Sequence, residues 1–400
     1  MRALILTNEF PPAIYGGAGV HVDELTRHLR SLVELDIRTF GVQSENAEGW
    51  RVQGYSPAHD LAGAGEHLRP LLAALSRDLG MVADPVDADV VHVHTWYTHL
   101  AGLLAKLAYG IPLVLTVHSL EPLRPWKREQ LGGGYDVSGW IERTVLQAAD
   151  AIVAVSSETR EDVLRLFEIP PERVHVIHNG IDSDFYHPDP GTAALERYGI
   201  DPSVPYVLFV GRITRQKGIV HLVRAVQHLD PGIGVVLCAG QPDTAEIGEE
   251  MQRGVAAAQA QRSNVVWIGE MVSREEARQL YSHAAVFCCP SVYEPFGIIN
   301  LEAAACETPV VASAVGGIPE VVVDGETGLL VPVELRLDDP MSPVDPDRFE
   351  LNLAGAINAL MADAPTREVM GRAARQRAVE RFSWVRIAEA TVDLYRSLLA

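Results

Sequence analysis

Short apolar runs rich in β-branched residues recur along the chain, and each is followed by a glycine or a small polar residue and then by a helical pattern. In the first half these runs cover residues 3–7, 90–94, 113–117, 151–155 and 174–177. In the second half they cover residues 206–210, 235–239, 265–268, 285–289 and 310–312. Apolar strands that alternate with helices are typical of parallel sheets covered on both faces. The pattern predicts an α/β fold with two similar halves.

The pattern restarts near Tyr206, after a stretch rich in proline, aspartate and glycine that is typical of a connection between domains. We therefore expect an N-terminal domain over residues 1–180 and a C-terminal domain over residues 181–382. Residues 383–400 form one amphipathic pattern, which predicts a C-terminal helix that packs on either half. Parallel sheets bind ligands at the carboxyl ends of their strands, so two such halves are expected to face each other across a cleft.

Two polar stretches interrupt this pattern. Residues 42–60 and 335–346 are polar or rich in proline and aspartate, and few of their apolar positions are regularly spaced. We expect both stretches to be surface excursions.

The charge balance narrows the class of ligand. The chain of 400 residues has 33 Lys and Arg against 53 Asp and Glu, a formal net charge of −20. A surface this acidic repels nucleic acid and anionic lipid. The apolar runs are far shorter than the ~20 residues of a membrane span, and the first residues lack a signal-peptide pattern. We therefore expect a cytoplasmic protein with no nucleic-acid partner and no membrane span, whose phosphorylated ligands need local cations.

Gly16, Gly17 and Gly19 lie between the first apolar strand and the helix that begins near Val20. Glycines let the backbone approach a ligand closely, and a helix N-terminus favours an anion. The spacing is neither Gly-x-Gly-x-x-Gly nor a P-loop, so it does not favour a redox cofactor or an ATPase. We interpret the loop as a ligand-binding turn, with a plain strand-to-helix turn as the alternative.

Arg212 and Lys217 lie in the loop Gly211–Gly218, again between an apolar strand and a helix. A guanidinium fork and a mobile ammonium can bind two phosphates together with backbone N–H groups. Three cations stand within this short loop of an otherwise acidic chain, since Arg215 lies between the other two. We interpret the loop as a diphosphate-binding site.

Glu294 and Glu302 follow the apolar strand 285–289, and Gly297 lies between them near the start of a helix. The amides at that helix start can bind phosphate. Glu302 lies about a turn and a half into the helix, where its carboxylate can accept both hydroxyls of a ribose. Glu294 can meet the sugar that is transferred. The paired glycines of the segment 316–320 follow the next strand and are either a ligand loop or a simple turn.

Histidines gather at the carboxyl ends of two strands in the first half. His94 and Trp96 stand at the end of one strand and His118 at the end of the next, where they suit sugar hydroxyls and sugar faces. We expect His92 to be a core histidine. A zinc site needs a closed set of ligands, and no acidic or cysteine partner is near in the sequence, so we expect no metal.

These motifs together resemble glycosyltransferase family 4. The resemblance is carried by Glu-Pro-Phe-Gly-Ile-Ile-Asn-Leu-Glu at 294–302, by Arg212 and Lys217, and by Gly-Gly-Ile-Pro-Glu at 316–320. It covers nearly the whole chain and implies the GT-B fold, with two Rossmann-like domains. Segments 8–21 and 117–127 are similar to the short, actinobacterial-type glycogen synthases, a group that includes an enzyme forming maltose 1-phosphate from ADP-glucose and glucose 1-phosphate.

The resemblance and the histidine pattern together predict three groups of site residues. The expected catalytic group is His118, Arg212, Lys217 and Glu294. The expected donor-binding group is Gly16, Gly17, Gly19, Phe296, Gly297, Ile298 and Glu302. The expected sugar or acceptor contacts are His94 and Trp96.

The family's roles follow for the residues that match its motifs. Arg212 and Lys217 would hold the donor diphosphate, and Glu302 the ribose. Glu294 would bind the hydroxyls of the transferred glucose, and His118 would lie near the reacting sugar. The longer bacterial glycogen synthases have a lysine before the paired glycines, whereas this chain has Ile14-Tyr15, which favours the short group.

The function implied is retaining transfer of glucose from ADP-glucose, without a metal or other cofactor, to an α-1,4-glucan end or to glucose 1-phosphate. Another retaining family 4 transferase, with a different nucleotide-sugar or acceptor, is the main alternative. A sugar-nucleotide epimerase and a non-catalytic nucleotide-sugar binder are further alternatives. Nothing in the sequence sets an oligomeric state.

Overall fold

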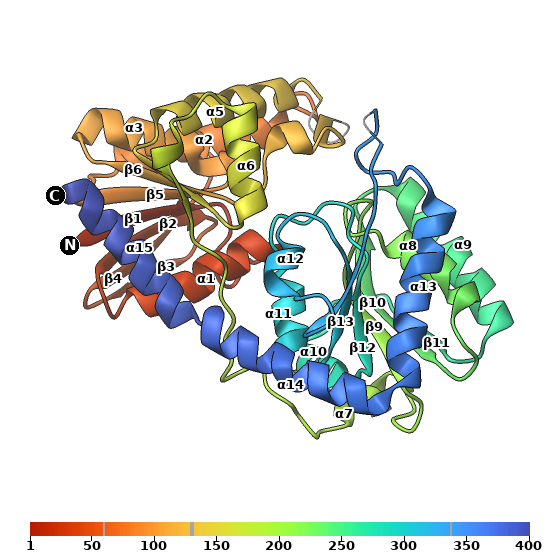
Figure 1. Cartoon of the computed structure of the whole chain (residues 1–400). Helices are drawn as coiled ribbons and strands as arrows, with labels where there is room; N and C mark the ends of the chain where they lie inside the picture. The colour runs from red at the N-terminus through yellow and green to blue at the C-terminus, as the bar shows by residue number, and fades with distance from the viewer. Residues whose placement is uncertain (59–60, 129–131, 337) are drawn as a thin grey trace. The chain divides into compact units, whose positions relative to one another are not determined.

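Figure 1 shows the computed structural model of the chain, which describes residues 1–58, 61–128, 132–336 and 338–400. The chain divides into two units, one of Met1–Gly180 with Trp384–Ala400 and the other of Ile181–Ser383. Each unit has a largely or wholly parallel sheet with helices packed on it, so the predicted α/β class is confirmed.

The first unit has its sheet in the order β3-β4-β2-β1-β5-β6-β7-β8. All neighbouring pairs are parallel except β3 with β4. The strands are β1 (Arg2–Thr7), β2 (Glu34–Phe40), β3 (Ser44–Ala47), β4 (Trp50–Tyr55), β5 (Val90–His94), β6 (Leu113–Val117), β7 (Ala151–Ala154) and β8 (Val174–Val176). The helices are α1 (Gly17–Leu29), α2 (Arg69–Ala83), α3 (His99–Tyr109), α5 (Gly134–Ala148), α6 (Ser157–Leu166) and α15 (Trp384–Leu399).

Helix α15 is the C-terminal helix that the sequence predicts, and it belongs to the first unit. Its apolar face, with Trp384, Ile387 and Tyr395, is buried in one core with residues of α1 and of the central strands. The hydroxyl of Tyr395 and the ring of His92 lie 2.6 Å apart, which joins the helix to β5. The helix therefore covers one face of the first sheet (Figure 1).

The second unit has its sheet in the order β11-β10-β9-β12-β13-β14, with every neighbouring pair parallel. The strands are β9 (Tyr206–Ile213), β10 (Gly234–Pro242), β11 (Val265–Ile268), β12 (Val286–Cys289), β13 (Val310–Ser313) and β14 (Gly328–Val331). The helices are α7 (Ala193–Arg197), α8 (Ile219–Ala225), α9 (Ala245–Gln261), α10 (Arg274–His283), α11 (Ile298–Ala305), α12 (Ile318–Val321), α13 (Pro346–Ala362) and α14 (Ala364–Arg381).

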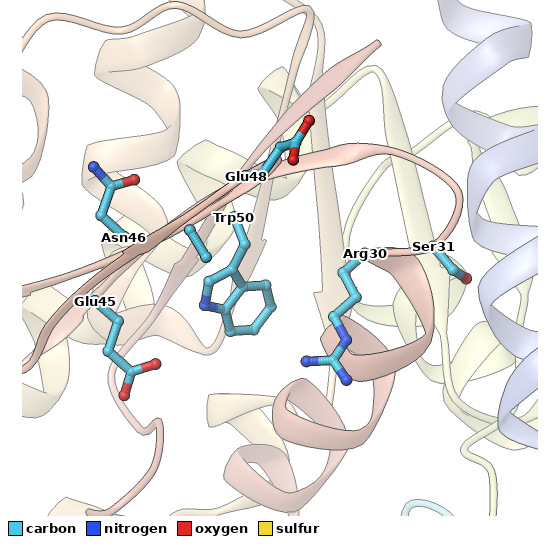
Figure 2. A pocket seen from close by; sticks show the side chains of 7 residues that line it. Arg30, Ser31, Glu45, Asn46, Glu48 and Trp50 are labelled. Carbon is cyan, nitrogen blue, oxygen red and sulfur yellow. The ribbon is translucent and has the colours of Figure 1, made fainter.

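The prediction that residues 42–60 are a surface excursion is wrong. They contain β3 and β4, which extend the first sheet beyond β2; residues 59 and 60 lie outside the described residues. Every residue of the edge strand β3 is exposed, and in β4 only Val52 is buried, so the apolar pattern was too weak to indicate strands. Figure 2 shows a hollow lined by this hairpin and by Arg30, whose guanidinium lies 6.0 Å from the Trp50 ring centre.

Both sheets contain a switch point, where the strand order reverses. In the first sheet β1 pairs with β2 on one side and with β5 on the other. In the second sheet β9 is flanked by β10 and β12. Loops diverge at the carboxyl ends of such strand pairs and leave room for a ligand. Within the described residues, no helix combines the length and apolar composition needed to cross a membrane.

Candidate functional site

At the switch point of the first sheet, the loop after β1 wraps around the carboxylate of Glu9. Oε2 of Glu9 accepts the backbone N–H groups of Tyr15 and Gly16, each at 2.8 Å. A Cβ added at Gly19 would lie 2.7 Å from the same oxygen. The close approach of Glu9 therefore explains the glycine at position 19. The Glu9 carboxylate also accepts hydrogen bonds from backbone amides of the loop that the sequence analysis interpreted as a ligand-binding turn. Donor binding by Gly16, Gly17 and Gly19 stays a prediction.

Three imidazoles meet at the same end of this sheet. His94 ends β5, His118 follows β6, and His21 lies in α1. Nδ1 of His94 is 3.1 Å from Nε2 of His118, and the ring centres of His21 and His118 are 4.7 Å apart. Nδ1 of His21 lies 2.6 Å from Oδ1 of Asn179. The structure thus joins two predicted residues, His94 and His118, to one that the sequence analysis missed.

Burial keeps these rings neutral at ordinary pH. It lowers the pKa of His21 to about 4, and the hydrogen bond with Asn179 opposes this only in part. Burial, with the nearby imidazole of His21, lowers the pKa of His92 to about 3. His94 is fully buried, and burial and the neighbouring rings hold its pKa well below the usual range. Neutral imidazoles can each donate one hydrogen bond and offer one lone pair.

His92 is a core histidine, as predicted: it is 1% exposed and lies within hydrogen-bond distance of Tyr395 and Thr116. Trp96 is 6% exposed and its ring stacks on Tyr97, with the ring centres 4.1 Å apart. The Trp96 ring is thus largely covered by protein, and its contact with a sugar stays a prediction. His118 is only partly buried. Of the predicted sugar contacts in this unit, His118 is the most accessible.

At the switch point of the second sheet, Lys217 and Glu294 form an ion pair. Lys217 follows β9 and Glu294 follows β12, and these two strands are neighbours. Nζ of Lys217 lies 2.6 Å from Oε2 of Glu294, which also accepts the Ser291 hydroxyl at 3.2 Å. The Lys217 and Glu294 side chains are 17% and 8% exposed. The two central predictions of the sequence analysis therefore meet in one charge pair.

The loops that hold this pair are packed backbone against backbone. Backbone N–H of Val292 donates to the carbonyl of Gln216 at 2.9 Å. Gly218 has φ +62, and a Cβ there would collide with the carbonyl oxygen of Pro290. Arg212, in contrast, donates to Asp243 at 2.9 Å, so the guanidinium is bound at the end of β10. Its contact with a diphosphate stays a prediction.

The paired glycines at 316–317 are explained by Glu294. Gly317 donates its backbone N–H to the carbonyl of Glu294 at 3.0 Å. Gly316 has φ +54, and a Cβ there would collide with the same carbonyl oxygen. The loop therefore holds the backbone of Glu294 in place. Its role here is to position Glu294, whichever ligand the site takes.

We expect Gly316→Ala to be strongly destabilising. The left-handed backbone costs an alanine about 1–2 kcal/mol, and relieving the collision with Glu294 costs about 1–3 kcal/mol more. Gly325→Ala is the matched control, because Gly325 has φ +75 with nothing within 4 Å of a built Cβ. Urea unfolding should show only the backbone cost in Gly325→Ala. Equal losses of stability in the two variants would contradict the packing role of Gly316.

The remaining predicted donor residues lie around the start of α11. Gly297 has φ +93 and precedes Ile298, the first residue of the helix. Phe296 is 2% exposed, and its ring centre is 5.8 Å from that of Phe382. Oε2 of Glu302 accepts the Tyr281 hydroxyl at 2.9 Å. Burial raises the pKa of Glu302, and the hydrogen bond from Tyr281 opposes this rise.

Several neighbours of the site could not be picked out from the sequence. Glu9, His21, Asn179, Asp243 and Ser291 each contact a predicted site residue or its loop. Glu9 and Ser291 each come shortly after a strand, and Ser291 is also near Glu294 in the sequence. The contacts of His21, Asn179 and Asp243 depend on which elements are neighbours in the fold.

Comparison with known proteins identifies the two units. The family Glycosyltransferase Family 4 matches residues 15–185, and the family Glycosyl transferases group 1 matches residues 192–339. The alpha-maltose-1-phosphate synthase of Mycolicibacterium smegmatis is 50% identical over 404 residues, with 100% of both chains covered. The enzyme of the same name from Mycobacterium tuberculosis is 49% identical over 405 residues, again with 100% of both chains covered.

Solved structures agree on the fold. A sucrose-phosphate synthase from Thermosynechococcus elongatus is 25% identical with a TM-score of 0.78, covering 100% of this chain and 99% of its own. The catalytic domain of starch synthase IV from Arabidopsis thaliana, at 17% identity and a TM-score of 0.75, covers 100% of this chain and 99% of its own. The chain is therefore a glycosyltransferase of the GT-B fold and belongs to glycosyltransferase family 4.

Proposed function

We propose that the protein transfers glucose from ADP-glucose, with retention of the α configuration, to glucose 1-phosphate or to the end of an α-1,4-glucan. The observation that carries this proposal is the Lys217–Glu294 pair at the switch point of the second sheet. An ammonium that can bind a phosphate thus lies next to a carboxylate that can accept hydrogen bonds from sugar hydroxyls. ADP-glucose rests on the resemblance of segments 8–21 and 117–127 to enzymes that use this donor.

The transfer breaks the bond between the glucose C1 and the diphosphate and forms one between C1 and an acceptor oxygen. Lys217 and Arg212 stabilise the charge that develops on the departing diphosphate. A phosphate oxygen takes the proton of the acceptor hydroxyl on the same face of the sugar, so the step needs no protein base and no metal. Glu294 accepts hydrogen bonds from the hydroxyls of the glucose, which orients C1.

The contacts of Glu294 suit this role. Oε2 is engaged by Lys217 and Ser291. No residue that the structure describes donates to Oε1, so a sugar hydroxyl can bind there without displacing a protein group. His118 is the partly exposed member of the histidine group and would lie beside the reacting sugar, with His94 behind it.

The relatives favour glucose 1-phosphate among the acceptors. The 50% identical protein is named for alpha-maltose 1-phosphate, which is a glucosyl unit joined to glucose 1-phosphate. D-inositol 3-phosphate glycosyltransferases, at 32% and 34% identity, are likewise named for a phosphorylated acceptor. A family 4 transferase with a different donor or acceptor is accordingly the second candidate.

The test offers ADP-glucose or UDP-glucose, each with glucose 1-phosphate or glycogen, and determines the anomeric configuration of the product by NMR. The expected result is fastest turnover with ADP-glucose and glucose 1-phosphate, and an α-linked product. A β-linked product would overturn the retaining mechanism. Release of free sugar with no acceptor, or exchange of deuterium at C2, would instead indicate an epimerase. Tight binding of ADP-glucose with no turnover would indicate a sensor.

A further inference from the structure

The histidine group of the first unit has the composition of a metal site. Among the described residues, one nitrogen each from His21, His94 and His118 lies within 4.8 Å of the other two. We propose that these three histidines bind a divalent transition-metal ion of the nitrogen-preferring class, such as Zn²⁺, and that the bound ion blocks sugar transfer.

The contact with Asn179 prepares His21 as a ligand. Because Oδ1 of Asn179 can only accept, Nδ1 of His21 carries the proton and Nε2 has the lone pair. Nε2 is buried and has no hydrogen-bond partner among the described residues. A metal-bound histidine usually donates its other ring N–H to an oxygen in this manner, which fixes the ring and its tautomer.

The other two rings are also suited to a metal. His94 is fully buried, and its Nδ1 faces the ring of His118. Nδ1 of His94 and Nε2 of His118 are 3.1 Å apart, close to the roughly 3.3 Å between nitrogens bound at about 2.0–2.1 Å to one tetrahedral Zn²⁺. In the metal-free protein one of these two nitrogens donates to the other. A bound ion would require the tautomers in which Nδ1 of His94 and Nε2 of His118 both carry lone pairs, a change that costs no net proton.

The surroundings favour a transition metal over Mg²⁺ or Ca²⁺. Imidazole suits Zn²⁺, Cu²⁺, Ni²⁺ and Co²⁺, whereas the hard ions require oxygen ligands, and the group contains no carboxylate. Three protein ligands leave a fourth position for water. His118, the partly exposed member, provides the access route.

Binding at this group would inhibit the enzyme. The ion would hold the ring of His118 and carry positive charge into the place where the glucose is expected. The expected inhibition rests on the proposed function, in which the transfer itself uses no metal. We therefore expect Zn²⁺ to lower turnover in proportion to occupancy, and a chelator to restore it.

The direct test is titration of the untagged protein with Co²⁺ and Zn²⁺. One equivalent of Co²⁺ should give the intense visible absorption of tetrahedral cobalt, and Zn²⁺ should abolish it by displacement. His21→Gln should lose both the absorption and the 1:1 Zn²⁺ binding seen by calorimetry. His228→Gln, which removes an exposed imidazole of the second unit, is the matched control and should bind as the wild type.

A milder variant guards against misfolding. Asn179→Ala should keep the three ligands and weaken Zn²⁺ binding about 10–100-fold, with circular dichroism confirming the fold. A Co²⁺ spectrum of the weak octahedral type, or unchanged Zn²⁺ binding in His21→Gln, would overturn the site. Tetrahedral binding without inhibition of an active enzyme would overturn only the inhibitory role. If no donor gives turnover, the proposed function fails while the binding result still decides the site.

Discussion

Lys217→Ala is expected to lower kcat/KM by roughly 10²-fold or more, the loss of one donor to the charge that develops in the transition state. This corresponds to about 2.7 kcal/mol or more of lost transition-state stabilisation. Nζ of Lys217 is held 2.6 Å from Glu294, at the switch point where the donor diphosphate is expected. The rate should be measured with ADP-glucose and glucose 1-phosphate at subsaturating donor.

A control variant must show what the loss of a lysine–carboxylate ion pair does when the lysine has no part in catalysis. Lys106→Ala is the matched control, because Nζ of Lys106 is also 2.6 Å from a carboxylate, that of Asp150, in the first unit. It should reduce stability slightly and leave turnover near the wild-type value. A folded Lys217→Ala enzyme with near-normal turnover would remove Lys217 from the diphosphate site.

The sequence could predict each half of the Lys217–Glu294 pair and could not predict that they touch. Apolar runs followed by glycines locate strand ends, and so place both residues at the carboxyl edge of a parallel sheet. Their contact depends on β9 and β12 being neighbours, although β10 and β11 lie between them in the chain. Strand order is decided by packing over the whole unit, and no local pattern reports it.

The same limit explains why the sequence did not predict β2, an interior strand of the first sheet. β2 contains Glu34, Asp36 and Arg38, and such charges are typical of exposed positions. Arg38 is nevertheless fully buried, because it donates to Asp36 and to the backbone carbonyls of Met81, Asp84 and Pro85. The backbone carbonyls among these acceptors come from residues far along the chain, so the sequence alone does not show that Arg38 can be buried.

His21 was missed for a related reason. It lies in α1 just after the glycine loop, and its neighbours in the sequence give no sign that it has a functional role. Its contacts with His94, His118 and Asn179 span the whole first unit. The apolar runs locate histidines at the ends of β5 and β6, but the third ring belongs to helix α1.

The buried histidines of the first unit should make it unusually sensitive to acid. Burial lowers the pKa of His99 to about 3 and that of His21 to about 4, while an unfolded histidine titrates near 6.5. Below pH 6.5 these histidines are therefore protonated in the unfolded chain but remain neutral in the folded unit. The contribution of these neutral imidazoles to the free energy of unfolding is fully present above pH 6.5. It is lost as the pH falls toward the pKa values that the histidines have in the folded unit.

The expected size is about 1.4 kcal/mol per pH unit for each such imidazole, or roughly 2 kcal/mol each at pH 5. Urea unfolding followed by tryptophan fluorescence between pH 7.5 and 5 measures it. Fluorescence reports mainly on the first unit, which holds Trp50, Trp96, Trp126, Trp140 and Trp384, whereas the second holds Trp267.

The variant His99→Leu tests the contribution of a single buried histidine to this acid sensitivity. His99 is 3% exposed, neither ring nitrogen has a hydrogen-bond partner among the described residues, and burial alone lowers its pKa. Its replacement should reduce the pH dependence of the unfolding free energy by about 1.4 kcal/mol per pH unit below pH 6.5. The slope matters here, since a change of side chain also shifts the stability at neutral pH. An unchanged slope in His99→Leu would mean that this ring is protonated in the folded unit, and the acid sensitivity would then need another source.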